Sequence, residues 1–232
     1  MNTIYKSARL EMAAADDQEL ELINRQTLRP LAAEEVFVFR LAACDDQVDR
    51  DFERFTVPCL EGFAKLFVGK PVLMDHVWSA KNLTARVYAA EVEETGGIHR
   101  LVLRCYLPKM EQTADTITAI EAGILRECSV GVAVGSAVCN ICGVDQTKAS
   151  CVHCPGREYE GQLCVMALDA PADAYEVSFV PVPAQPGAGA VKSKRYGTPE
   201  ESDPTGGTPG EQMGWREEAV LALEKVRFDG GM

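Results

Sequence analysis

Three side chains that lie far apart in the sequence together have the chemistry of a serine-based hydrolase: His76, Ser129 and Glu176. A serine hydroxyl is a weak nucleophile at pH 7 and needs a base within hydrogen-bond distance. Histidine is the residue whose unperturbed pKa suits that work. A carboxylate can fix the tautomer of the imidazole and stabilise the imidazolium. The chain therefore carries one complete set, in the order His, Ser, Glu, provided that the fold brings the three together.

Ser129 lies in a predicted β-strand, because valines alternate there with very small residues. The core face of this strand is predicted to carry Ile124, Cys128, Val130, Val132 and Val134. The opposite face carries Glu127, Ser129, Gly131, Ala133 and Gly135, so beyond its hydroxyl it is nearly bare, and another backbone or a peptide can approach Ser129 closely. The thiol of Cys128 is expected to point away from that face, which makes it a poor second choice of nucleophile.

His76 follows a short apolar strand predicted over residues 72–74 and stands beside Asp75. A side chain at the end of a strand emerges at the rim of a sheet, where a rigid scaffold places functional groups. The other two histidines are expected to do other work. His99 lies within a strand and is interpreted as an exposed structural residue, and His153 stands between two cysteines, where a metal site or a plain loop is expected.

Glu176 lies in the last predicted strand, residues 174–180, and shares one face with Ser178. If that strand is central, the carboxylate needs a partner, because an unpaired buried charge is costly. An imidazole would supply one. Asp75 and Asp173 remain alternatives for the third member of the set.

Nine cysteines are many for a chain of 232 residues, and four of them form two C-x2-C pairs separated by eight residues. The predicted ligands of a structural, tetrahedral Zn²⁺ are Cys139, Cys142, Cys151 and Cys154. His153 or Cys164 can replace one of them. The role is expected to be structural, since four protein ligands leave no position for a reactive water. Cys44, Cys59 and Cys105 are interpreted as small buried hydrophobic residues.

The net charge and the lengths of the apolar runs argue against several functional classes of protein. The net charge of −12 argues against nucleic-acid binding, which needs clustered Lys and Arg. No apolar run reaches the length that spans a bilayer, and the N-terminus shows no signal peptide, so neither a membrane nor secretion is expected. A hydrophobic content of 47% is ordinary for a globular protein.

The predicted elements give an α+β fold that is mostly β: a small, mostly antiparallel barrel or sandwich decorated by helices. The predicted organisation is an N-terminal arm or helix (residues 1–34), a main domain (35–191) with a cysteine-rich insertion (138–165), a Gly/Pro-rich linker (192–211) and a C-terminal amphipathic helix (212–232).

Three local motifs together resemble the prohead (capsid maturation) proteases of tailed phages, distant relatives of the herpesvirus assemblins. The first is the apolar strand that runs into Asp75 and His76. The second is the segment LRECSVG (residues 125–131), similar to the strand that carries the nucleophile in that family. The third and most specific is AYEVSFVPVPAQP (residues 174–186), which looks like the closing signature of the family. The resemblance covers roughly residues 36–191.

The resemblance implies a serine endopeptidase with an assemblin-like barrel wrapped by helices, which needs no cofactor for catalysis. His76 matches the base, Ser129 the nucleophile, and Glu176 the place of the third residue. The implied substrates are the major capsid protein, its scaffold and the protease itself. The implied location is the immature capsid in the cytoplasm of a bacterial host, or a prophage-encoded equivalent, with self-association inside the prohead. The cysteine-rich insertion departs from the family pattern, and the oxyanion donors are not marked in the sequence.

Two other functions remain as competing hypotheses. One is a catalytically silent, zinc-stabilised protein of capsid assembly or scaffolding. The other is a metal-dependent hydrolase centred on the cysteines, which is disfavoured because no carboxylate is paired with them.

Overall fold

The computed structural model describes residues 15–191. The chain divides into two compact units, Met1–Lys194 and Arg195–Met232, and all described residues belong to the first. The predicted linker (192–211) and C-terminal helix (212–232) lie outside the described residues, as do residues 1–14 of the predicted N-terminal arm. Within the described residues, no helix is long and apolar enough to cross a membrane.

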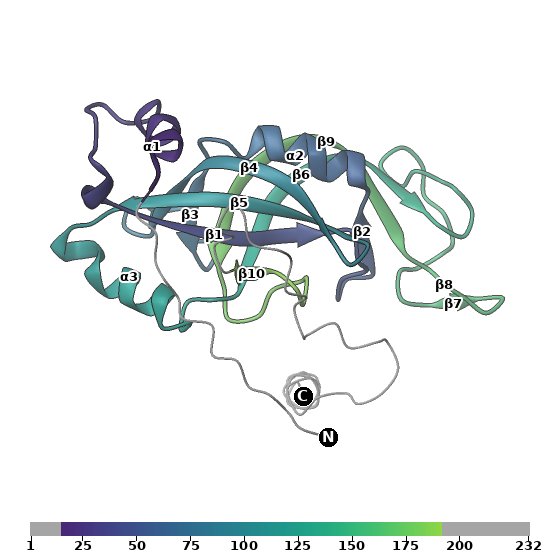
Figure 1. The fold of residues 1–232 in the computed structure, drawn as a ribbon. Helices are drawn as coiled ribbons and strands as arrows, with labels where there is room; N and C mark the ends of the chain where they lie inside the picture. The colour runs from purple at the N-terminus through teal and green to yellow at the C-terminus, as the bar shows by residue number, and fades with distance from the viewer. Residues whose placement is uncertain (1–14, 192–232) are drawn as a thin grey trace, which may run out of the picture. The chain divides into compact units, whose positions relative to one another are not determined.

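The described residues form a mixed α+β structure in which strands predominate (Figure 1). The helices are α1 (Asp17–Asn24), α2 (Val57–Leu66) and α3 (Ala114–Glu121), with short 3-10 turns at Ala33–Glu35 and Glu111–Thr113. The strands are β1 (Val36–Asp45), β2 (Glu53–Phe55), β3 (Pro71–Met74), β4 (Ala85–Thr95), β5 (Ile98–Pro108), β6 (Cys128–Cys139), β7 (Glu158–Tyr159), β8 (Gln162–Leu163), β9 (Met166–Phe179) and β10 (Gly189–Val191).

One sheet contains all the long strands, in the order β10-β1-β5-β4-β3-β9-β2, and β6 pairs with β9. Strand β6 pairs antiparallel with one edge of β9 along the whole length of β6. The other edge of β9 is therefore left to β2 and β3, and both of these strands run parallel to β9. The β7–β8 hairpin is a separate small sheet, and Figure 1 shows it at the opposite end of the large sheet from α1 and α3.

The large sheet is not closed into a barrel, which differs from the architecture expected from the sequence. Its two ends approach each other at an isolated bridge between Glu127, just before β6, and Gly189 of β10. The N–H of Ala190 also donates to the carbonyl of Arg126 at 2.7 Å. These contacts bring the ends of the sheet together without forming a continuous ladder.

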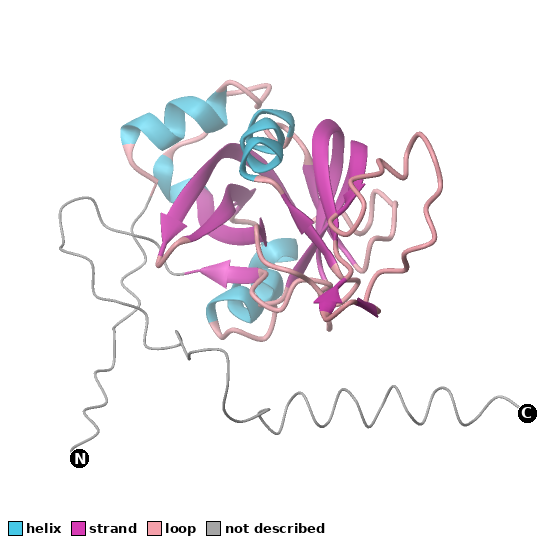
Figure 2. Cartoon of the chain, turned by 90° about the vertical axis from the view of Figure 1, so that its right-hand side faces the viewer, coloured by secondary structure: helices cyan, strands magenta, loops and turns pink. Residues whose placement is uncertain are grey.

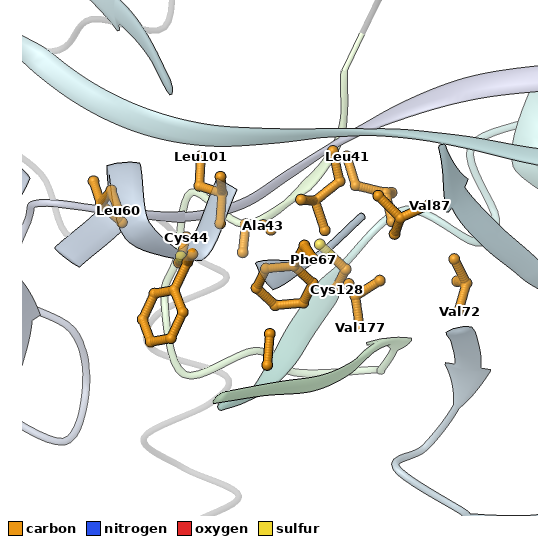
Figure 3. Close-up of a cluster of buried hydrophobic side chains, with 14 of the residues drawn as sticks. Leu41, Ala43, Cys44, Leu60, Phe67, Val72, Val87, Leu101, Cys128 and Val177 are labelled. Atoms are coloured by element: carbon orange, nitrogen blue, oxygen red, sulfur yellow. The ribbon is translucent and has the colours of Figure 1, made fainter. Parts of the chain in front are cut away.

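Helix α2 and the residue that follows it contribute Leu60 and Phe67 to the main hydrophobic core (Figure 3). Its start is fixed by Thr56, whose side chain accepts the N–H of Cys59 at 3.2 Å, as an N-cap does. Leu60, Phe63 and Phe67 recur at helical spacing, and all three are fully buried. Burying each such side chain contributes roughly 1.5–3 kcal/mol. Figure 2 shows the helices beside the strands.

The elements expected from the sequence are largely present, and the differences are local. The helical spacing of Leu60, Phe63 and Phe67 predicts a helix at residues 57–67, and Gly96 and Gly97 predict the turn of a hairpin; both predictions are confirmed. Ile124 was expected on the core face but is 77% exposed, because the chain is still in the loop after α3 at that point. The short strands β2 and β10 were not expected, since each is held by a distant partner rather than by its own pattern.

Candidate functional site

Strand β9 brings the predicted residues together because it lies between β3 and β6. Ser178 of β9 is opposite Leu73 of β3 on one edge and opposite Ser129 of β6 on the other. His76 follows β3 by two residues, so it reaches the same end of β9. The Cβ atoms of directly opposed residues in an antiparallel pair lie about 4.5–5.5 Å apart. Three distant segments therefore meet at one place on the sheet.

His76 and Glu176 form a hydrogen-bonded pair. Nδ1 of His76 lies 2.7 Å from Oε1 of Glu176. The carboxylate side chain is only 2% exposed, whereas the imidazole is 42% exposed. In the tautomer with its proton on Nδ1, the ring donates to the carboxylate and keeps a basic lone pair on Nε2. This arrangement holds the base by one nitrogen and leaves the other for a reacting group.

The backbone at His76 is in a conformation that residues other than glycine rarely adopt. Both Asp75 and His76 have positive φ, 53° and 56°. Each such residue costs of the order of 1–2 kcal/mol, and observed outliers of this kind concentrate at functional sites. Hydrogen bonds offset the cost: Asp75 N–H donates to the carbonyl of Phe179 at 3.0 Å, and Val77 N–H to that of Met74 at 3.0 Å.

Gly131 leaves the space in which the Glu176 carboxylate lies. The two residues are opposite each other in the β6–β9 ladder. A Cβ atom at position 131 would stand 2.5 Å from Oε1 of Glu176, closer than real contacts allow. The small residues beside Ser129 therefore do more than admit a second backbone, because one of them makes room for the carboxylate that holds His76.

Ser129 is half-buried on the same face of the ribbon as these groups. Among the described residues its hydroxyl makes no hydrogen bond, and none joins it to His76. Hydrogen bonds between a nucleophile and its base are often long without substrate and tighten in the complex. The structure thus brings Ser129 beside a His–Glu pair without closing the last contact.

The alternatives to these residues are placed elsewhere. Asp173 lies opposite Ala133, and its carboxylate is 3.2 Å from Nζ of Lys70. Cys128 points into the core, where burial raises the pKa of its thiol to about 12. His99 bonds Asp46 through Nδ1 at 2.8 Å, in keeping with a structural role. Of the carboxylates considered, Glu176 is the one bonded to His76.

The other end of the same two strands leads into the cysteine-rich insertion. A group of ligand atoms within 4.8 Å of one another is formed by Cys139, Cys142, Cys151 and His153, and this Cys3His cluster can hold a metal ion. His153 takes the place that the sequence assigned to Cys154. Cys154 lies outside this group; its backbone N–H donates to the hydroxyl of Tyr159 at 2.9 Å, and its side chain is exposed.

The turn after Cys139 has the form that metal-binding C-x2-C pairs use. Gly143 N–H donates to the carbonyl of Cys139 at 2.8 Å, and Gly143 has a φ of 73°. Desolvation acts to raise the pKa of the Cys139 thiol, but the N–H groups of Cys142 and Ile141 outweigh it and lower that pKa. Thiolates are the form that binds metal, so this turn favours a metal ligand.

Two neighbours orient the second half of the cluster. The amide of Gln146 donates to Sγ of Cys151 at 3.2 Å and lowers the pKa of that thiol. The ring of His153 packs edge-on against Tyr159, with centroids 4.5 Å apart. Nδ1 of His153 is buried and has no hydrogen-bond partner among the described residues. A buried ring nitrogen without a protein partner, beside three thiols, is the pattern expected of a metal ligand.

Cys164 lies beside the cluster without belonging to it. Its sulfur is 3.9 Å from that of Cys139. Burial and the contact with Cys139 raise the pKa of the Cys164 thiol to about 11.

Comparison of the chain with protein-family models, with curated proteins and with solved structures gave no match. The site stands on its geometry alone.

Sequence reasoning missed two residues of the site, Ser178 and Gly131. Ser178 shares a face with Glu176, and that spacing was the available signal. The contact of Gly131 with Glu176 had no signal in the sequence, because it depends on the register between β6 and β9.

Proposed function

We propose that this protein is a serine endopeptidase in which Ser129 is the nucleophile, His76 the general base and Glu176 the group that orients His76. The observation that carries the proposal is the hydrogen bond between Nδ1 of His76 and the buried carboxylate of Glu176, at the end of β9 where Ser129 is one strand away. A histidine that is merely exposed on the surface does not require a buried carboxylate as its hydrogen-bond partner, nor a strained backbone conformation. A general base that must keep one tautomer and one orientation needs a partner of this kind.

The chemistry follows from the two nitrogens of the imidazole. Nε2 of His76 takes the proton of Ser129 as Oγ attacks the scissile carbonyl, and the imidazolium is stabilised by Glu176 across the Nδ1 contact. His76 then returns the proton to the leaving amine as the C–N bond breaks. Water, deprotonated by His76, hydrolyses the acyl-enzyme and frees Ser129.

A peptide is the substrate class that the surroundings of Ser129 favour. Strand β6 pairs with β9 on one edge; on its other edge, within residues 15–191, the ladder is limited to isolated bridges of Glu127 and Val138 near its two ends. An extended chain can add to such an edge through main-chain hydrogen bonds. Beyond Ser129 the same face of β6 carries only Gly131, Ala133 and Gly135, so its side chains take up little space there.

An apolar hollow close in sequence to His76 suits a substrate side chain. It has a volume of about 280 Å³, and its lining is Pro71, Leu73, Trp78, Ser79, Ala80 and Leu83. Trp78 is 66% exposed although it is large and apolar. An aromatic side chain left in water beside a candidate active site is a natural contact for an apolar residue of a peptide.

The biological setting proposed is that of a capsid maturation protease related to the assemblins. The motifs around His76, Ser129 and Glu176 support it, and so does the meeting of the two ends of the sheet at Glu127 and Gly189. The substrates would be the major capsid protein and its scaffold, cut inside the immature shell in the host cytoplasm, where copies of the protease associate with one another.

A fluorophosphonate probe tests the enzyme without knowledge of its substrate. Activated serine displaces fluoride from phosphorus, and His76 takes the proton, so labelling adds a fixed mass to Ser129. Intact mass of the full chain should show one adduct, absent from Ser129→Ala and His76→Ala and retained in the control Ser150→Ala, an exposed serine. Coexpression with the capsid protein and its scaffold then asks for cleavage that disappears with Ser129→Ala. Absence of both labelling and cleavage would refute the protease.

That negative result would favour the second candidate, a catalytically silent protein of capsid assembly. The missing hydrogen bond between Ser129 and His76 is the observation on its side. Binding to the capsid protein without cleavage would be its positive evidence.

We also propose that the Cys3His cluster holds a structural Zn²⁺. Three thiols and one imidazole are a ligand set that tetrahedral zinc accepts, and the buried Nδ1 of His153 without a partner supports it. Four protein ligands leave no position for water, which argues against a zinc hydrolase. Elemental analysis should give one zinc per chain, lost in His153→Ala and kept in the matched control Cys154→Ser. Retention of zinc in the first variant and loss in the second would reverse the ligand assignment.

A further inference from the structure

We infer that Ser178 is a positioning residue of the proposed reaction: its hydroxyl fixes both His76 and Glu176 and thereby sets the base in front of Ser129. This inference rests on the proposed function. Two serines face each other across β6 and β9, and they differ in accessibility. Ser129 is half-buried, whereas Ser178 is 0% exposed. A substrate can reach only the first, so the second needs a different explanation.

The hydroxyl of Ser178 accepts one hydrogen bond and donates another. Oγ accepts the backbone N–H of His76 at 3.1 Å, and the O–H donates to Oε2 of Glu176. A hydroxyl has one proton to give, so its donation to the carboxylate leaves the lone pairs for the N–H of His76. The direction of both bonds is thus determined.

These bonds close a ring of contacts around the base. His76 is held at two points: its backbone N–H by Ser178, and its Nδ1 by Oε1 of Glu176. Glu176 in turn is held through both oxygens, one by His76 and the other by Ser178. A carboxylate that is 2% exposed needs such partners, because a buried oxygen without one destabilises the charged form.

The strained backbone of His76 explains why a second point of attachment is needed. With φ of 56° the residue is in the left-handed region, and without compensation it would relax toward ordinary φ and carry the ring away from Glu176. The hydroxyl of Ser178 bonds the N–H in that conformation. Ser178 therefore acts through His76 and Glu176 and has no contact with the substrate.

The test compares variants at this position in the full chain by two independent readouts. The first is the rate of fluorophosphonate labelling of Ser129, with kcat and KM for a peptide cleaved by the wild type. The second is the NMR resonance of the His76 Nδ1 proton, assigned with His76→Ala; it reports the His–Glu contact whether or not the protein cleaves anything. Ile23→Ala is the control, since Ile23 is fully buried in a separate cluster around α1.

Ser178→Ala should slow labelling roughly 10- to 100-fold, the usual effect of a misplaced catalytic group, with kcat lowered and KM little changed. The Nδ1 proton resonance should move or broaden. Ser178→Thr, which keeps the hydroxyl, should recover much of the rate, and Ile23→Ala should label like the wild type. If Ser178→Ala fails to fold, Ser178→Cys keeps the volume with a weaker donor and should give an intermediate rate.

Wild-type labelling and an unchanged Nδ1 resonance in Ser178→Ala would overturn the inference. So would equal losses in Ser178→Ala and Ile23→Ala, since general destabilisation would then explain both. If the wild type is not labelled, the protease proposal fails, and the NMR comparison alone decides whether Ser178 positions His76.

Discussion

The β6–β9 ribbon has two ends that carry different chemistry. At one end Ser129, Ser178 and Glu176 lie in paired strands, and a hydrogen bond between the buried side chains of Ser178 and Glu176 fixes those two. At the other end Cys139 leaves β6 and enters a long loop whose ligands converge without being held by a ladder. The first end is organised by strand register, and the second by turns that bring together a group able to hold a metal ion. Hydrogen-bonded strands can by themselves hold the groups that orient a histidine. A loop that buries few apolar side chains needs a metal ion to fix its geometry.

The two ends also differ in whether their buried polar atoms have hydrogen-bond partners within the protein. Glu176 has a partner for each oxygen, so that end is complete without any ligand. The buried Nδ1 of His153 has none among the described residues, and the proposed Zn²⁺ would supply that partner. Four predictions ask whether the two ends depend on different interactions, from the largest expected effect to the smallest.

Glu176→Gln should reduce fluorophosphonate labelling of Ser129 by roughly 10³- to 10⁴-fold, because the amide can no longer stabilise the imidazolium or fix its tautomer. The matched control is Asp173→Asn, which removes a carboxylate bonded to Lys70 and not to His76. Labelling rates of both variants give the answer. Equal rates in the two would show that Glu176 has no part in activating Ser129.

Gly131→Ala should slow labelling about 100-fold while leaving the zinc content unchanged. The new methyl group would stand 2.5 Å from Oε1 of Glu176 and push the carboxylate away from His76. In the control Gly135→Ala the nearest atom is the carbonyl oxygen of Ala170 at 3.3 Å, which a small shift accommodates. A normal labelling rate in Gly131→Ala would show that the clearance is not needed.

Trp78→Ala should raise KM for a peptide substrate roughly 3- to 10-fold with kcat nearly unchanged, since a hydrophobic contact distant from the reacting bond acts on binding. Steady-state kinetics measure the two constants separately. The control is Leu163→Ala, an exposed apolar residue of the distant β7–β8 hairpin. A fall in kcat alone would assign Trp78 to the chemical step instead.

Removal of zinc with a chelator should lower Tm by roughly 5 °C or more but change the labelling rate by about twofold at most. The physical reason is that the ladder from Ser129 to Cys139 is held by its own hydrogen bonds and not by the loop. Thermal melts and labelling of the same sample separate the two effects, and readdition of Zn²⁺ should restore Tm. A loss of labelling that matches the loss of zinc would mean that the two ends are coupled.

Sequence reasoning selected His76, Ser129 and Glu176 because each stands at a recognisable place in a strand pattern, and their catalytic roles stay a prediction. It identified three of the four cluster residues because C-x2-C spacing is a local constraint. Helix α2 and the β4–β5 hairpin followed in the same way, from helical spacing of Leu60, Phe63 and Phe67 and from the turn at Gly96. In each case the physical cause acts within a few residues of the chain.

The tertiary structure decided the features that depend on register and on the path of loops. Two register shifts interrupt the β6–β9 ladder; the first leaves Tyr175 outside it and puts Glu176 opposite Gly131. Strand register and the path of the loops also decide three other features: the open sheet, the place of His153 rather than Cys154 in the cluster, and the two hydrogen bonds of Ser178. The local sequence pattern predicts which residues can carry chemistry, because periodicity and motif spacing involve residues that are close together in the sequence. Long-range pairing decided which of them meet, because hydrogen bonds between strands join residues that the sequence keeps far apart.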